Sequence, residues 1–123
     1  MSDASPRAAP VPSVAGLPPT SLIIPSRGRP ELLLAAVQSI LAGQCVPSEL
    51  IVVDHSDAPL PALAELTTER DCQVHYLWST ARGVSRGRND GIRSAQHDIL
   101  VFVDDDVIVS PLWFGTLVGA LAG

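Results

Sequence analysis

The sequence predicts an α/β fold in which a mostly parallel sheet carries helices on both faces. Short apolar runs rich in β-branched residues alternate along the chain with segments whose apolar residues recur at helical spacing. The 123 residues, 46% of them hydrophobic, leave room for one modest domain with a real core. Strands that alternate with helices form βαβ units, and the strands of such units run parallel.

The first strand and the first helix have clear boundaries. Residues 21–25 form a short apolar run, and the turn-forming residues 26–30 follow it. Pro30 suits the first position of a helix, where its missing N–H costs nothing. Apolar residues then recur at helical spacing until Gly43 ends the pattern.

The middle of the chain predicts two further strands around a weaker helix. Residues 50–53 are apolar and β-branched, and the polar residues 54–57 end this second strand. Residues 61–70 have a less regular helical pattern. Residues 73–78 alternate well enough for a third strand.

The last third of the chain predicts a helix, a strand and a helix. Ser85 can cap a helix that runs through Ala95. Residues 99–103 form the fourth strand, and Ser110 with Pro111 opens a last helix whose apolar residues face one side.

Composition limits the classes of function. A net charge of −5 argues against general nucleic-acid binding, which needs a positive surface. Cys45 and Cys72 lack the spacing of a zinc site, so we expect reduced, buried thiols. Residues 1–19 are rich in Pro, Ala and Ser and do not form a secretory signal, so we expect a disordered leader before a domain at 20–123.

The uncharged stretch at residues 107–123 falls short of the roughly 20 apolar residues that span a bilayer, and Pro111 interrupts it. We therefore expect a cytoplasmic protein, with peripheral membrane association as an alternative.

Three polar clusters follow the first, second and fourth predicted strands, at residues 26–29, 54–57 and 104–106. Because ligands of open α/β sheets bind beyond the carboxyl ends of the strands, these clusters predict one binding site. The last cluster is three consecutive carboxylates, which repel one another unless a cation or arginines compensate them. An exposed acidic turn is the alternative interpretation, and the convergence of three clusters favours the ligand site.

With these motifs in this order, the sequence resembles the nucleotide-sugar-binding half of a family 2 inverting glycosyltransferase. The resemblance covers roughly residues 20–110 and rests on four motifs: Ser21 to Arg29, Ile51 to Ser56, Gly83 with Arg88 to Ile92, and Phe102 to Val107. It implies the Rossmann-like GT-A fold, a mostly parallel sheet with flanking helices, here incomplete at the C-terminus.

The resemblance also implies roles for the residues that precede the acidic cluster. Pro25, Ser26 and Arg27 would border the nucleobase pocket. Asp54 would accept a hydrogen bond from a base N–H, most often that of uracil, and Asp57 is a weaker candidate in the same loop.

Five more positions take roles from the resemblance. Arg88 would approach the base or the diphosphate, and Asn89 would hold the geometry of its loop. Asp104 would contact the ribose and is also a candidate metal ligand, and Asp105 would be the variable middle residue. Asp106 would coordinate a Mn²⁺ or Mg²⁺ that bridges the diphosphate, since these hard ions prefer carboxylate and phosphate oxygens.

The implied function is metal-dependent transfer of a sugar, with inversion, from a nucleotide diphosphate sugar to an unknown acceptor glycan or lipid. A UDP-sugar is the favoured donor, and cell-envelope polysaccharide biosynthesis is the expected setting. The family's catalytic base comes from a segment beyond residue 123, so we assign no catalytic residue and expect a truncated form. The alternative is a non-catalytic nucleotide-sugar-binding or interaction module, with self-association through the uncovered sheet.

Other interpretations carry less weight. A receiver-like phosphoryl-transfer domain would place carboxylates after the first strand, and residues 26–29 have none. No Gly-rich loop ends in Lys-Ser or Lys-Thr, which excludes a P-loop nucleotidase. The three histidines form no ligand pattern, and we expect His55 to be a solvated loop residue. We expect Trp78 and Trp113 to be core or interface residues.

Overall fold

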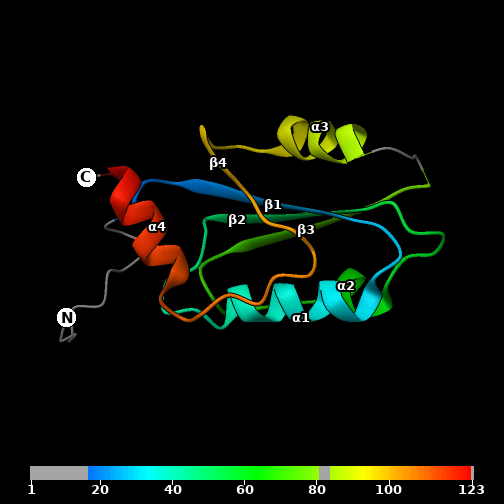
Figure 1. Cartoon of the computed structure of the whole chain (residues 1–123), viewed down its shortest axis with the longest axis horizontal. Helices are drawn as coiled ribbons and strands as arrows, with labels where there is room; N and C mark the ends of the chain where they lie inside the picture. Colours follow the sequence, from blue (N-terminus) through cyan, green and yellow to red (C-terminus); the bar gives the residue numbers. More distant parts are fainter. Residues whose placement is uncertain (1–16, 81–83, 123) are drawn as a thin grey trace.

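The computed structural model describes residues 17–80 and 84–122 of the chain (Figure 1). Strands and helices alternate along it as the sequence predicts. The elements are β1 (Thr20–Ser26), α1 (Pro30–Leu41), β2 (Glu49–Asp54), α2 (Pro61–Ala64), β3 (Gln73–Trp78), α3 (Val84–Ser94), β4 (Ile99–Phe102) and α4 (Trp113–Ala122).

The four strands form one sheet in the order β3-β2-β1-β4, and every neighbouring pair is parallel. The chain therefore builds outward from β1 through β2 to β3, and then crosses back to place β4 on the other side of β1. The strand order reverses between β1 and β4, the position at which open α/β sheets bind ligands. The predicted fold class is confirmed.

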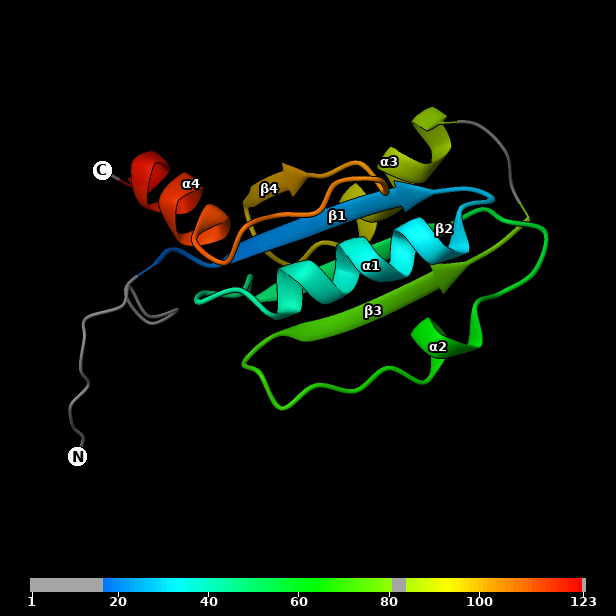
Figure 2. The same cartoon turned by 60° about the horizontal axis from the view of Figure 1, so that its bottom comes forward.

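Helices cover both faces of the sheet, with α1 and α2 on one face and α3 on the other (Figures 1 and 2). Alternation along the strands sorts the core into two clusters. Leu22 and Ile24 of β1 belong to the larger cluster, with α1 and α4, whereas Ile23 belongs to the smaller cluster, which includes Ala95 just after α3. Helix α4 lies at the end of the sheet where β1 begins (Figure 2).

Helix α3 lies unusually close to β1 because Gly91 has no side chain. A Cβ built at Gly91 would overlap the methyl group of Ile23, a fully buried residue at the centre of β1. Helix α4 contains the opposite case, since a Cβ at Gly119 would meet no atom within 4 Å. The close approach of α3 to the sheet therefore depends on glycine at one position.

Three helix boundaries differ from the predictions. Helix α3 begins at Val84, so Ser85 lies inside the helix rather than at its cap. Helix α2 ends at Ala64, six residues before the predicted end at Arg70. The Thr68 hydroxyl accepts a hydrogen bond from the Arg70 N–H at 3.0 Å, a local bond that competes with helix formation. Helix α4 begins at Trp113 rather than at Ser110, whose carbonyl instead accepts from the Trp113 N–H at 3.1 Å.

The expectations for the two tryptophans and the two cysteines are confirmed in part. Trp113 packs against the larger core cluster as predicted, but Trp78 is 39% exposed, and its indole N–H donates to the Ser56 carbonyl at 2.9 Å. Cys45 and Cys72 are both reduced, as expected. Cys45 is buried, whereas Cys72 is only partly so, and burial raises the pKa of the Cys72 thiol to about 12.

The predicted leader at residues 1–19 lies almost wholly outside the described residues, and so does the predicted contact at Gly83. Across the described ranges 17–80 and 84–122, no helix combines the length and the apolar character needed to cross a membrane.

Candidate functional site

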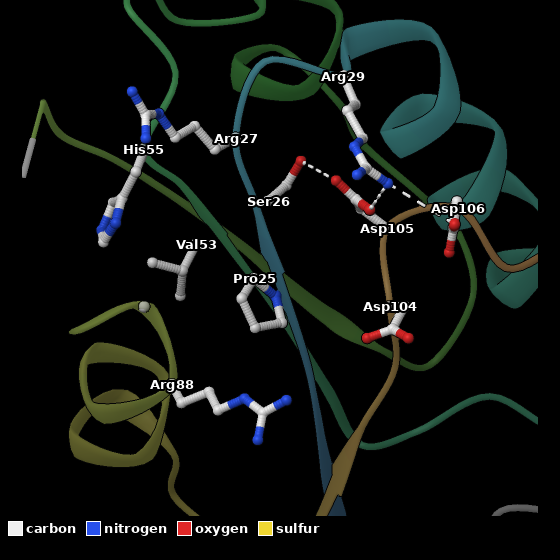
Figure 3. A pocket seen from close by; sticks show the side chains of 11 residues that line it. Pro25, Ser26, Arg27, Arg29, Val53, His55, Arg88, Asp104, Asp105 and Asp106 are labelled. Carbon is white, nitrogen blue, oxygen red and sulfur yellow. Dashed lines mark hydrogen bonds and ion pairs between the residues drawn. The ribbon is translucent and has the colours of Figure 1, made fainter. Parts of the chain in front are cut away.

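A cavity of about 520 Å³ opens where the carboxyl ends of β1, β2 and β4 meet the beginning of α3 (Figure 3). Four separate segments of the chain line it, and three of them are the loops that the sequence analysis singles out. The lining residues are Pro25, Ser26, Arg27, Arg29, Val53, His55, Gly87, Arg88, Asp104, Asp105 and Asp106. The structure therefore brings the predicted clusters together at the point where strand order reverses.

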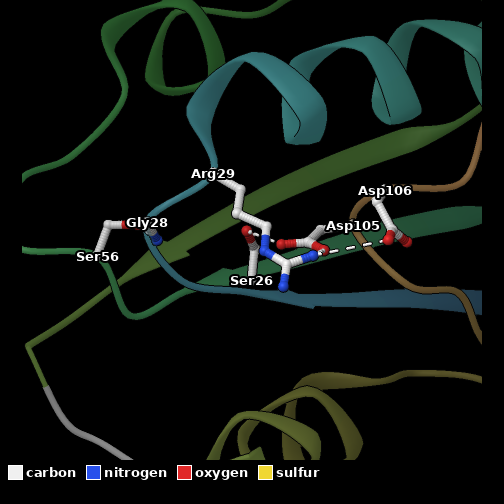
Figure 4. Close-up of polar contacts among 6 residues, drawn as sticks. All are labelled: Ser26, Gly28, Arg29, Ser56, Asp105 and Asp106. Atoms are coloured by element: carbon white, nitrogen blue, oxygen red, sulfur yellow. Dashed lines mark hydrogen bonds and ion pairs between the residues drawn. The ribbon is translucent and has the colours of Figure 1, made fainter.

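The acidic triplet is held against the end of β1. The Val103 N–H donates to the Ile23 carbonyl at 3.0 Å, which continues the pairing of the two segments beyond β4. Asp105 turns inward, is 8% exposed, and accepts a hydrogen bond from the Ser26 hydroxyl at 2.8 Å (Figure 4). Asp104 and Asp106 remain exposed on either side of it. The middle carboxylate is thus structural, and the outer two are open to a ligand.

Arg29 supplies positive charge to this triplet. Its Nη1 lies 3.4 Å from Asp105 Oδ1 and 3.6 Å from Asp106 Oδ2 (Figure 4). The Arg29 side chain is 53% exposed, so these ion pairs are screened and contribute little to stability. Arg29 was not among the predicted site residues, and its position just before Pro30 at the start of α1 was the available signal.

A hydrogen bond joins the loop after β1 to the loop after β2. The Gly28 N–H donates to the Ser56 hydroxyl at 2.6 Å, and Gly28 has a φ of 70°, which glycine adopts without strain. The Ser56 hydroxyl in turn donates to Asp54 Oδ1 at 2.5 Å. Arg27 lies in the chain between Ser26, the last residue of β1, and Gly28. It is exposed and lines the cavity.

Asp54 is buried beside the cavity, and its assignment to the nucleobase stays a prediction. It is 2% exposed, and its Oδ2 accepts from the Tyr76 hydroxyl at 2.6 Å. Burial, followed by the hydrogen bond to Asp54, raises the pKa of Tyr76 to about 12. Asp54 is not among the described residues that line the cavity, so the structure gives it a supporting position beneath the loop. Asp57 is exposed and also lies outside the lining.

His55 occupies the cavity wall instead, and the expectation that it is solvated is wrong. It is 4% exposed, and its Nε2 lies 3.4 Å from Asp90 Oδ2 of α3. The period of two along β2 explains why His55 rather than Asp54 lines the cavity. Val53 and His55 point to the face that α3 covers, whereas Asp54 points to the other face. That alternation was the signal that could have identified His55.

Helix α3 completes the cavity from the side opposite the acidic triplet. Arg88 lines the cavity and its side chain extends across it in the direction of Asp104 (Figure 3). A Cβ at Gly87 would lie 3.4 Å from Pro25, an ordinary van der Waals contact, so glycine is not required at this wall. Asn89 is exposed and is not a lining residue, consistent with no direct contact to a ligand in the cavity.

The donor set fits one kind of metal site. Within residues 17–80 and 84–122, no three His, Cys, Asp or Glu side chains are grouped to hold an ion by themselves. Mg²⁺ and Mn²⁺ can be bound by one or two carboxylates, with the remaining positions taken by water and phosphate oxygens. The exposed carboxylates of Asp104 and Asp106 fit such an ion in complex with a phosphorylated ligand, and the described residues do not form a closed protein cage.

Comparison with known proteins agrees with this architecture. The family model described as glycosyl transferase family 2 matches residues 21–123. The O-antigen biosynthesis protein RfbC of Myxococcus xanthus is 30% identical over 108 residues, 85% of this chain and 8% of RfbC. The uncharacterized glycosyltransferase EpsJ of Bacillus subtilis (strain 168) is 28% identical over 102 residues, 82% of this chain and 30% of EpsJ.

Solved structures share the fold. A crystal structure of S. aureus TarS 1–349 matches with a TM-score of 0.65 at 23% identity, over 85% of this chain and 31% of TarS 1–349. The same fragment in complex with UDP-GlcNAc matches with a TM-score of 0.61 at 22% identity, over 85% of this chain and 30% of that one. The chain thus spans less than a third of each of these proteins. The family match over nearly all of the described fold shows that the chain belongs to glycosyl transferase family 2.

Proposed function

We propose that residues 20–123 form the nucleotide-sugar-binding part of a glycosyltransferase domain that transfers a sugar, with inversion, from a nucleotide diphosphate sugar. The main support is the cavity at the carboxyl ends of the strands, with exposed carboxylates on one wall and arginines on the others. A UDP-sugar is the proposed donor, supported by the TarS complex with UDP-GlcNAc. The name of RfbC supports a polysaccharide of the cell envelope as the setting.

The cavity offers separate surfaces for the parts of such a donor. Pro25, Val53 and Gly87 present apolar or small groups that suit a nucleoside, and His55 adds a ring with polar atoms. Arg27 and Arg88 provide guanidinium groups, which bind phosphate oxygens in a planar, two-point manner. These residues bind and orient the donor.

Asp104 and Asp106 would hold Mn²⁺ or Mg²⁺ in this proposal. The ion, when bound, supplies positive charge that stabilises the departing nucleoside diphosphate. Asp105 would act through its hydrogen bond from Ser26, which ties the acidic triplet to the end of β1.

No lining residue is assigned as the base that would deprotonate an acceptor hydroxyl, because such a base needs to lie about 3 Å from that proton. We propose that this base is supplied from outside residues 20–123. A second candidate follows from the same observation: a module that binds the nucleotide sugar without transferring it.

Calorimetric titration with UDP, in the presence and absence of Mn²⁺, tests the proposal. We expect Mn²⁺-dependent binding to the wild type and at least a tenfold loss in Asp106→Ala. Because Asp106 is exposed, the free energy of unfolding should change by less than about 0.5 kcal/mol. Asp98→Ala is the matched control, since Asp98 is an exposed aspartate at the other end of the same strand.

Equal UDP affinity in the wild type and Asp106→Ala would contradict the proposed metal site. Release of UDP from a UDP-sugar then separates the two candidates. Binding with UDP release supports a transferase. Because the proposed base lies outside residues 20–123, the module is supported only if the full-length protein also binds the UDP-sugar without releasing UDP.

A further inference from the structure

Phe102 is a large apolar side chain left 40% exposed at the end of β4, immediately before the acidic triplet. A single exposed apolar residue is ordinary on a protein surface. This one has a charged neighbour, because the guanidinium carbon of Arg88 lies 5.7 Å from the centroid of its ring. That distance falls within the range of a cation–π interaction.

The contact joins helix α3 to the end of the strand that follows it, β4. Arg88 comes from α3, which packs on β1 and β2, whereas Phe102 comes from the edge strand β4. Arg88 also lines the cavity, on the wall that faces the acidic triplet (Figure 3). The ring of Phe102 therefore holds the same guanidinium that faces the proposed site of the diphosphate.

An aromatic ring holds a guanidinium differently from a carboxylate. A cation–π contact uses none of the N–H donors of the guanidinium in a hydrogen bond, so the contact with Phe102 leaves them available to a ligand. Arg29 provides the contrast, since its Nη1 is already directed at Asp105 and Asp106. An arginine side chain loses considerable rotamer freedom when it binds a ligand, and a contact that orders it beforehand reduces that loss.

We propose that Phe102 is a positioning residue, which orients the Arg88 guanidinium for the diphosphate of the bound nucleotide. This inference rests on the proposed function of the cavity and adds a residue to it. Phe102 contributes through Arg88 and makes no contact of its own with the nucleotide. Its effect on affinity should therefore disappear when Arg88 is removed.

A double-mutant cycle with UDP and Mn²⁺ as the probe tests this dependence. We expect Phe102→Leu to weaken UDP binding about two- to fivefold, the size of an exposed cation–π contact. Phe102→Tyr, which keeps the ring, should bind UDP as the wild type does. In the Arg88→Ala background, Phe102→Leu should cause no further loss.

Thermal unfolding of every variant accompanies the titrations, and Leu32→Ala serves as the control. Leu32 is a 48% exposed apolar residue of α1, outside the cavity lining, and its truncation should leave UDP affinity unchanged. A merely structural role for Phe102 would give the same loss with and without Arg88, which would overturn the inference.

The outcomes also separate this inference from the proposed function. If Arg88→Ala weakens UDP binding and Phe102→Leu does not, the positioning role is wrong and the binding site stands. If Arg88→Ala has no effect on UDP affinity, the role of Arg88 in the site and the inference about Phe102 both fail.

Discussion

Both ends of the sheet carry acidic residues, but these residues differ in burial and in hydrogen-bond partners. At the amino end of β2, Glu49 is 1% exposed and is enclosed by partners. Its Oε1 accepts from the Ser21 hydroxyl at 2.7 Å and the Gln96 N–H at 3.0 Å, and its Oε2 lies 3.1 Å from His75 Nε2. At the carboxyl end, Asp105 and Asp54 are held by partners, whereas Asp104 and Asp106 face the cavity.

The difference separates acids that build the fold from acids that can serve a ligand. Burying a carboxylate is costly unless its oxygens accept hydrogen bonds or meet a positive group, and Glu49 Oε1 meets that condition through Ser21 and Gln96. Asp54 shows that location alone does not decide, because it lies at the ligand end and yet its oxygens accept from Tyr76 and Ser56. The partners of each oxygen, rather than its end of the sheet, indicate its role.

The largest expected effect is at the amino end of β2, where Glu49 is buried. Glu49→Ala leaves the Ser21 hydroxyl and the Gln96 N–H without their acceptor and should lower the free energy of unfolding by about 3 kcal/mol or more. Denaturant titration measures this loss. Glu49→Gln keeps one acceptor oxygen and should lose less.

Folded Glu49→Ala should bind UDP with wild-type affinity, because the cavity lies at the other end of the strands. Weakened binding by a variant that is still fully folded would break the distinction between the two ends.

A smaller loss is expected where α3 approaches the sheet. Gly91→Ala forces a methyl group against Ile23 and should destabilise the chain by about 2 kcal/mol, a typical cost of overpacking. Because α3 carries Arg88 to the open end, UDP affinity should fall as well. Gly119→Ala is the matched control in α4, and there the higher helix propensity of alanine should add about 0.5–1 kcal/mol of stability. A neutral Gly91→Ala would contradict the close packing.

The smallest expected effect concerns Asp54, which is buried and hydrogen-bonded although it lies at the carboxyl end of β2. Tyr76→Phe removes the hydroxyl that donates to Asp54 and should cost about 1.5 kcal/mol. The folded pKa of Tyr76 is raised to about 12, above the value of about 10 in an unfolded chain. The unfolded state therefore loses this proton first, and the stability that Tyr76 contributes below pH 10 should be lost between about pH 10 and 12.

Tyr76 is the single tyrosine of the sequence, so phenolate absorbance reports its titration directly. In Tyr76→Phe, the decline in stability over that pH range should be shallower. A phenolate that forms near pH 10 in the folded protein would show that Asp54 does not hold Tyr76 as described.

Much of the fold could be predicted because its signals are local. Each apolar run predicts a strand, and each polar cluster after a strand predicts one side of the cavity. The side chains inside the cavity were harder to predict, since one residue of offset moves a strand position to the other face. That offset is the difference between Asp54, which was assigned to the nucleobase, and His55, which lines the cavity. Arg29 was missed because its position depends on a long, exposed side chain.

The central place of β1 has a consequence for motion. This strand pairs with β2 on one side and with β4 on the other, and residues 22–24 are fully buried. Its continuation supplies Pro25, Ser26, Arg27 and Arg29 to the cavity. Local opening starts where backbone hydrogen bonds are few and exposed, so the edge strands β3 and β4 should exchange their amide hydrogens first. The cavity is thus attached to the segment that opens last, and its floor should keep its shape while the borders of the sheet fluctuate.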